Sequence, residues 1–92
     1  MQKLDLSIII PAFNEAQSIP QLYNLITDKL SEKLLSYEVI FIDDGSNDDT
    51  WKEMQKIIIS DKKVKAIKFS KNYGKSDALD AGFKESEGDY IL

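Results

Sequence analysis

The stretch VIFIDDGSNDDT, from Val39 to Thr50, decides the fold that this sequence predicts. Its first four residues are apolar and either β-branched or aromatic, which is typical of a strand buried on both faces of a sheet. Two adjacent carboxylates, Asp43 and Asp44, follow the strand at once, and the turn residue Gly45 comes next. Because α/β sheets bind ligands at the carboxyl ends of their strands, this stretch predicts both a sheet and a polar site at its edge.

Strand and helix patterns alternate along the rest of the chain. Strands are expected near residues 4–11, 37–43, 64–69 and 89–92. The first contains the apolar run 7–10, which predicts burial on both faces, and Pro11 is expected to end it. The third contains lysines, which suits a strand near the sheet edge. Between the strands, apolar residues recur at helical spacing in three groups: Ile19, Leu22, Tyr23, Ile26, Leu30 and Leu34; then Trp51, Met54, Ile57 and Ile58; then Ala78, Leu79, Gly82 and Phe83.

This order of elements predicts an α/β fold. Short connections between alternating strands and helices favour a three-layer αβα, Rossmann-like arrangement, in which helices cover both faces of a mainly parallel sheet. Residues 1–92 are expected to form one domain or one part of a larger domain. The loops 11–15, 43–49 and 70–75 are expected to meet at the carboxyl edge of the sheet.

Composition excludes several classes of protein. The chain has no cysteine and no histidine, so disulfide frameworks, thiolate metal sites and Ser/His/Asp triads are impossible. Its net charge of −4 argues against nucleic acid as a partner. No apolar run is long enough to span a membrane, and the first residues lack the apolar region of a signal peptide. A cytoplasmic protein is expected, with no transmembrane segment in this chain.

Three familiar ligand-binding motifs are absent. The GKS sequence at 74–76 lacks the glycine that a phosphate-binding loop places five residues earlier, where Phe69 stands. No G-x-G-x-x-G follows the first strand, so a dinucleotide fingerprint is missing. A calcium loop beginning at Asp44 needs glycine where Asp49 stands and glutamate where Gln55 stands.

Three polar segments carry the remaining signal: PAFNE at 11–15, IDDGS at 42–46 and FSKNYGKSDAL at 69–79. A carboxylate at a strand end accepts hydrogen bonds from the N–H groups of a base or from ribose hydroxyls, and this is the expected role of Asp44. Asp43 is expected to bond to nearby backbone, because adjacent carboxylates repel each other. Asp48 or Asp49 is expected to cap the helix that follows.

Three further residues have two interpretations each. Phe13 packs against a base or sugar, or it belongs to the core. Glu15 belongs to the site, or it is a favourable anion just before a helix. In one interpretation Lys75 contacts a diphosphate, because the free N–H groups at the start of a helix favour anions. Alternatively, it is one of six lysines from Lys62 to Lys75 that form a solvated face. Taken together, the segments predict a nucleotide site.

In these three segments the sequence resembles the family 2 glycosyltransferases of the GT-A fold. The resemblance is strongest to the branch that includes dolichol-phosphate mannose synthases and undecaprenyl-phosphate glycosyltransferases, and it covers all 92 residues. It implies that the chain is the N-terminal, donor-nucleotide-binding part of a catalytic domain. Phe13 stands where the family often has tyrosine, and Asn72, Gly74 and Lys75 match a family segment. The nucleotide-binding residues that it implies are Pro11, Phe13, Glu15, Ile42, Asp44 and Lys75.

The resemblance also implies an activity for the whole protein. A sugar would pass from a UDP- or GDP-sugar to an acceptor, with a polyprenyl phosphate as the candidate, by an inverting mechanism at the inner face of a membrane. Mg²⁺ or Mn²⁺ would neutralise the leaving diphosphate, and its principal ligands, like the catalytic base, would lie beyond this chain. No catalytic or metal-binding residue is therefore expected here, and the segment alone is expected to be inactive.

Two other classes compete with this interpretation. In a response-regulator receiver, an acidic pair follows the first strand and a phosphoacceptor aspartate follows the third, whereas here these strands end in Pro11 and Ser70. The sequence disfavours that class. A non-catalytic α/β module, which binds a nucleotide or a partner and has kept only the fold, stays open as the alternative.

Overall fold

A computed structural model, which describes residues 4–33 and 35–91, contains alternating strands and helices in the predicted order. Leu34 and Leu92, which were assigned to the first helix and the last strand, lie outside the described residues. The elements are β1 (Leu4–Ala12), α1 (Ser18–Ser31), β2 (Tyr37–Asp43), α2 (Thr50–Ser60), β3 (Val64–Lys68), α3 (Lys75–Glu85) and β4 (Gly88–Ile91). Within this part of the chain the strands form one sheet in the order β3-β2-β1-β4, and every neighbouring pair is parallel. The predicted α/β fold is confirmed.

Strand β2 is the centre of the molecule. All seven of its residues are buried, as the apolar run predicted, because β1 and β3 flank it and helices cover both of its faces. Val39 and Phe41 pack in one core cluster with Met54 of α2. Ile40 and Ile42 point to the opposite face, where they pack with Ile9 and Ala78. The two clusters divide the core into the two halves that a three-layer fold requires.

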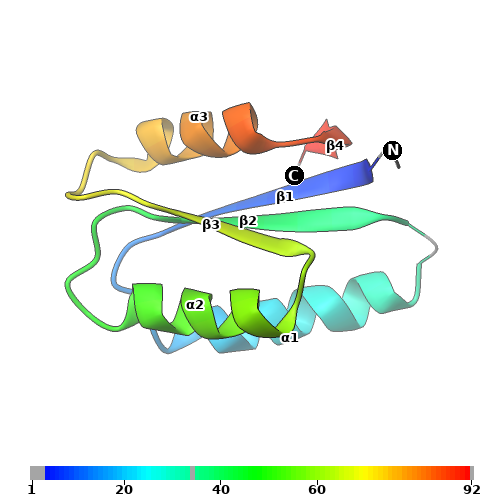
Figure 1. Cartoon of the computed structure of the whole chain (residues 1–92), viewed down its shortest axis with the longest axis horizontal. Coiled ribbons are helices and arrows are strands. Elements are labelled where there is room, and N and C mark those ends of the chain that lie inside the picture. The colour runs from blue at the N-terminus through cyan, green and yellow to red at the C-terminus, as the bar shows by residue number, and fades with distance from the viewer. Residues whose placement is uncertain (1–3, 34, 92) are drawn as a thin grey trace.

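The three helices lie on two sides of the sheet (Figure 1). Helices α1 and α2 cover one face, and α3 covers the other. Helix α3 lies close to the strands at Gly82, where a Cβ atom would be only 2.4 Å from Cγ2 of Ile9. The amino ends of α2 and α3 both lie at the edge where β1, β2 and β3 end (Figure 1).

Pro11 does not end β1, contrary to the prediction, because the strand continues to Ala12. The backbone oxygen of Ala12 accepts a hydrogen bond of 2.9 Å from the amide of Asp44, so Ala12 directs its polar groups toward β2. Its neighbour Pro11 therefore directs its nitrogen away from β2. On that side β4 is paired with β1 only from Leu4 to Ser7. The missing N–H of Pro11 thus breaks no ladder bond that the structure describes.

The burial of β1 differs from the sequence prediction, whereas the position of β3 agrees with it. Ile8 and Ile10 are only half-buried, so β1 is not fully buried on both faces. A shallow apolar hollow lies beside them, bordered by Leu25 and Ile26 of α1, because α1 covers this part of β1 incompletely. Strand β3 is at the edge of the described sheet, as its lysines predicted.

A buried carboxylate lies near the amino end of β2. Glu38 is 3% exposed, and its Oε2 accepts hydrogen bonds of 2.6 Å from the Ser7 hydroxyl and from the amide of Glu87. Its Oε1 lies 3.0 Å from the ammonium group of Lys65. Burial raises the pKa of Glu38, but the hydrogen bonds and the Lys65 charge outweigh it and hold that pKa below its ordinary value of 4.5. The carboxylate joins β1, β2, β3 and the segment that enters β4.

We expect Glu38→Gln to lower the free energy of unfolding by about 1–3 kcal/mol, because an amide cannot satisfy Lys65 on one side and two donors on the other. The depressed pKa means that the stabilising contribution is present above the unfolded pKa of about 4.5 and is lost as the pH falls through the folded pKa. Urea unfolding from pH 7 to pH 3 should therefore show a constant gap between wild type and variant that narrows below about pH 4.5.

The matched control is Glu53→Gln, which removes a carboxylate whose ion pair joins it to the exposed side chain of Lys56. Its effect should stay within about 0.5 kcal/mol, because exposed pairs contribute little. Equal losses in the two variants, or a gap that does not change with pH, would contradict the assigned role of Glu38.

Candidate functional site

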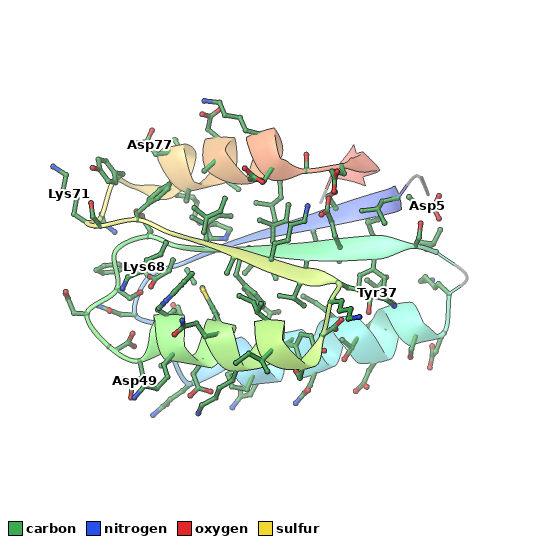
Figure 2. The ribbon with its side chains drawn as sticks, in the orientation of Figure 1. Asp5, Tyr37, Asp49, Lys68, Lys71 and Asp77 are labelled. Carbon is green, nitrogen blue, oxygen red and sulfur yellow. The ribbon has the colours of Figure 1, made fainter. Side chains whose placement is uncertain are left out.

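Three loops meet at the carboxyl edge of the sheet, as the parallel topology requires. They follow β1, β2 and β3 and span residues 13–17, 44–49 and 69–74. Figure 2 shows Asp49, Lys68, Lys71 and Asp77 at this end of the molecule, and Asp5 and Tyr37 at the opposite end. Residues that are distant in sequence therefore gather at one end of the molecule.

The loops after β1 and β2 are joined by hydrogen bonds. The amide of Asn14 donates to the Ser46 hydroxyl at 2.8 Å, and the amide of Asn47 donates to Oδ1 of Asn14 at 2.8 Å. Asn14 has a φ of 54°, a left-handed conformation that asparagine tolerates better than most residues. The amide of Glu15 donates to the Thr50 hydroxyl at 2.9 Å. These bonds fix the PAFNE loop against the start of α2.

Asp43 and Asp44 have different partners. Asp43 is fully buried, and its Oδ1 accepts a hydrogen bond of 2.9 Å from the amide of Ser46, so the predicted local backbone bond is confirmed. Asp44 is 5% exposed and bonds to the third loop. Its Oδ1 accepts from the amide of Tyr73 at 2.8 Å, and its Oδ2 accepts from the amide of Gly74 at 3.0 Å and from Nδ2 of Asn72 at 3.1 Å. The Asp44 carboxylate thus holds the segment that leads into α3.

Gly45 brings the second and third loops into contact. Its φ of 76° is a conformation that favours glycine, and a Cβ atom there would lie 2.2 Å from the carbonyl carbon of Lys71. The side chain of Asn72 strengthens the same contact, because its Nδ2 also donates to the backbone oxygen of Asp44 at 3.2 Å. The turn chemistry of the IDDGS segment therefore serves a contact between loops.

A hollow of about 420 Å³ lies beside the Asp44 carboxylate. Its lining residues are Pro11, Ala12, Phe13, Glu15, Asp44, Asn72, Gly74 and Lys75. Five of the six residues that the sequence assigned to nucleotide binding are among them. The sixth, Ile42, does not line the hollow, because its side chain is fully buried in the core cluster on the α3 side of the sheet.

Three lining residues were not assigned to the site from sequence. Ala12 stood in the PAFNE segment but was not assigned, because its methyl side chain has no polar or aromatic group that indicates ligand binding. Asn72 and Gly74 stood in the segment that matched the family, but nothing in the sequence alone connected them with Asp44. In the sequence, the available signal was that Gly74 stands just before a predicted helix. In the structure its φ is 106°, a conformation that favours glycine.

The charges around the hollow are mixed. Lys75 begins α3, so its ammonium group and the free N–H groups of the first helical turn give one wall a positive potential. Glu15 and Asp44 supply negative charge on the other walls. Of the six lysines from Lys62 to Lys75, Lys75 lines the hollow. Others contact rings elsewhere, such as Lys63 over Tyr37.

The acidic pair at 48–49 serves α2. Oδ1 of Asp48 accepts hydrogen bonds from the amide of Thr50, at 2.9 Å, and from the Thr50 hydroxyl. The hydroxyl bond is the main cause that lowers the pKa of Asp48. Asp49 is the residue that precedes the helix, but its side chain makes no capping hydrogen bond. Of the two predicted caps, Asp48 therefore has the side chain that satisfies the helix start.

Metal ligands do not gather in the part of the chain that the structure describes. Across residues 4–33 and 35–91, no group of three or more aspartate or glutamate side chains is placed to hold a cation. The residues around the hollow therefore do not form a metal site by themselves. In the same residues, no helix combines the length and apolar character that crossing a bilayer requires.

Comparison with known proteins identifies relatives over almost the whole chain. Residues 7–92 match the family model described as Glycosyl transferase family 2. The chain is 37% identical over 87 residues to the undecaprenyl-phosphate 4-deoxy-4-formamido-L-arabinose transferase of Proteus mirabilis. The match covers 94% of this chain and 27% of the relative, so the chain spans about a quarter of the length of that protein.

Solved structures share the fold. The mannosyltransferase PcManGT from Pyrobaculum calidifontis, in complex with GDP-Man and Mn²⁺, superposes with a TM-score of 0.79 at 20% identity. That match covers 99% of this chain and 27% of PcManGT. Residues 1–349 of S. aureus TarS, in complex with UDP-GlcNAc, superpose with a TM-score of 0.79 at 25% identity, over 97% of this chain and 25% of the TarS chain.

We expect Gly45→Ala to destabilise the protein more than Gly74→Ala. Both residues have a φ that favours glycine, which costs an alanine about 1–3 kcal/mol. Only at Gly45 does the new Cβ also meet backbone atoms, those of Lys71 and Asn72, and the shift this forces adds about 1–3 kcal/mol. Midpoints of urea unfolding with unchanged slopes would measure the difference. Equal losses would show that the two loops are not in the contact described.

Proposed function

The chain belongs to glycosyltransferase family 2, and from this premise we propose that the hollow beside Asp44 binds the nucleoside diphosphate of a sugar donor. One observation carries the proposal. Three kinds of group that a nucleotide needs, an aromatic ring, a carboxylate and a cation at a helix start, line a single hollow at the carboxyl edge of a parallel sheet.

Each part of a nucleotide has a matching group in the hollow. Phe13 is 41% exposed and lines the hollow, so its ring is available to a base or a sugar. Asp44 accepts from an N–H of the base or from a ribose hydroxyl. Lys75 and the free N–H groups that open α3 face the diphosphate. Glu15 lines the same hollow and is a second acceptor for hydroxyl groups.

For the whole protein we infer transfer of a sugar to a polyprenyl phosphate with inversion at the anomeric carbon. The name of the Proteus mirabilis relative supports an undecaprenyl-phosphate acceptor. In such a reaction an oxygen of the acceptor displaces the nucleoside diphosphate directly, so this chain's residues orient the leaving group. A lipid-linked acceptor would place the reaction at the inner face of a membrane.

A divalent cation, Mg²⁺ or Mn²⁺, belongs to the same proposal. It would stabilise negative charge on the leaving diphosphate, and the Mn²⁺ bound with GDP-Man in PcManGT supports it. Its principal ligands would lie beyond this chain, since no group of three or more carboxylates gathers among the described residues. The role assigned to this chain is donor recognition.

The first test is Asp44→Asn in the intact protein. Its NH2 group would place a donor against the N–H of either Tyr73 or Gly74, so the wall of the hollow loses an acceptor and its shape is disturbed. Calorimetric titration with UDP and GDP should show that the preferred nucleotide binds about tenfold more weakly, or worse. The control, Asp49→Asn, changes an exposed carboxylate outside the hollow and should bind like wild type.

Lys75→Ala tests the diphosphate contact separately. Lys75 makes no bond to the Asp44 carboxylate, so the loops should keep their arrangement. Affinity for the nucleoside diphosphate should fall about tenfold, while affinity for the nucleoside alone should not change. Unchanged diphosphate binding in both Asp44→Asn and Lys75→Ala would remove the hollow from donor recognition.

Turnover separates the enzyme from a non-catalytic module of the same fold. The intact protein, given UDP-glucose or GDP-mannose together with a polyprenyl phosphate and Mg²⁺ or Mn²⁺, should release a nucleoside diphosphate and form a glycosylated lipid. Binding of nucleotide without turnover of any sugar donor would favour the module.

A further inference from the structure

We propose that Thr50 and Asp48 are positioning residues for donor binding, because they fix the backbone of the loop that carries Glu15. The inference rests on the proposed function, since it assumes that Glu15 contacts the donor. It goes beyond that function by assigning a role to two residues that do not line the hollow.

Consecutive backbone amides of the loop after β1 donate to these two residues. The amide of Glu15 donates to the Thr50 hydroxyl at 2.9 Å, and the amide of Ala16 donates to Oδ2 of Asp48 at 3.4 Å. Residues 13–17 lie between β1 and α1, so no strand or helix fixes the backbone there. The side chains at positions 48 and 50 therefore determine the path of this loop.

Thr50 couples the two contacts. It is fully buried, and its hydroxyl accepts from the amide of Glu15 while donating its own proton to Oδ1 of Asp48. An ionised carboxylate can only accept hydrogen bonds, so Asp48 turns the hydroxyl proton toward itself and leaves a lone pair of the same oxygen for Glu15. The Thr50 hydroxyl therefore has one orientation, and it suits the amide of Glu15.

The Glu15 carboxylate depends on this backbone contact for its position. It is exposed, and within the described residues it has no hydrogen bond or ion pair of its own. It borders two hollows: the donor hollow, and another of about 450 Å³ that residues 14–18 and 48–49 line. Because the side chain is unrestrained, the position of its backbone decides how often the carboxylate reaches the donor hollow.

Thr50→Val in the intact protein tests the contact, because valine keeps the shape of the side chain and removes the hydroxyl. The amide of Glu15 and Oδ1 of Asp48 each lose a partner, whereas the hydrogen bonds of Asn14 to Ser46 and Asn47 remain. The loop should therefore stay attached while Glu15 shifts. Calorimetry should show about five- to tenfold weaker binding of whichever of UDP and GDP the wild type prefers. Thr50→Ser keeps the hydroxyl and should bind within about twofold of wild type.

A double-mutant cycle distinguishes positioning from a general weakening of the fold. In protein that carries Glu15→Ala, the further change Thr50→Val should weaken binding by about twofold or less, because the group that Thr50 positions is gone. A purely structural role would give the same loss in both backgrounds. Urea midpoints measure the stability of each variant separately, and the titrations are made where every variant is folded.

Thr27→Val is the matched control, because it makes the same substitution in α1. The Thr27 hydroxyl donates to the backbone oxygen of Asn24 at 3.0 Å, outside the three loops. Its nucleotide affinity should equal that of wild type. Should Thr50→Val fail to fold, Asp48→Ala takes its place in the cycle with the same expectations, because it removes the acceptor that orients the Thr50 hydroxyl.

The outcomes separate the two proposals. If wild-type protein binds neither UDP nor GDP, the proposed function itself fails. If it binds one of them and the change at Thr50 or Asp48 has no effect, or has the same effect with and without Glu15, the positioning role is wrong while donor recognition stands. Wild-type affinity in Glu15→Ala alone would also overturn the positioning role, since there would be no contact to position.

Discussion

The carboxylate of Asp44 is the interaction on which the rest of the site depends. Taking a carboxylate out of water is costly unless hydrogen bonds replace the lost solvation, and here three donors from the segment 72–74 do so. In return the carboxylate fixes the turn that starts α3, almost thirty residues further along the chain. Without it, the wall of the hollow formed by Asn72, Gly74 and Lys75 would have no fixed relation to β2.

A second carboxylate makes the same kind of contact at the other end of β2. By the alternation of β2, Glu38 belongs to the face that α3 covers, and Asp44 directly follows the strand. Asp44 accepts backbone N–H groups just before α3, and Glu38 accepts the amide of Glu87 just after it. Lys65 neutralises the second carboxylate, which would otherwise oppose the negative end of the helix dipole. Helix α3 is thus held at both ends by one strand, and its positive end faces the hollow.

The sequence predicted the elements well because their signals are local. The apolar run 39–42 and the helical spacing of apolar residues depend on near neighbours alone. They therefore predicted the alternation of strands and helices, and with it the three loops that meet at the carboxyl edge of the sheet. The partners of Asp44 could not be predicted, because they are backbone groups that lie 28–30 positions away. Ile42 was assigned to the hollow only through resemblance, whereas the packing of α3 against β2 buries its side chain. Pro11 lies within the strand because β4 pairs with β1 only as far as Ser7, so no ladder bond needs the missing N–H. No local sequence pattern indicates where that pairing ends.

A crystal structure of the intact protein with UDP tests the central claim most directly. The account predicts the nucleoside in the hollow between Phe13 and Asp44, with an N–H of the base or a ribose hydroxyl within hydrogen-bond distance of the carboxylate. It also predicts that the amides of Tyr73 and Gly74 still donate to the same carboxylate, and that the diphosphate lies near Lys75. A nucleotide bound elsewhere, or an Asp44 side chain that has released the segment 72–74 in order to bind the base, would contradict it.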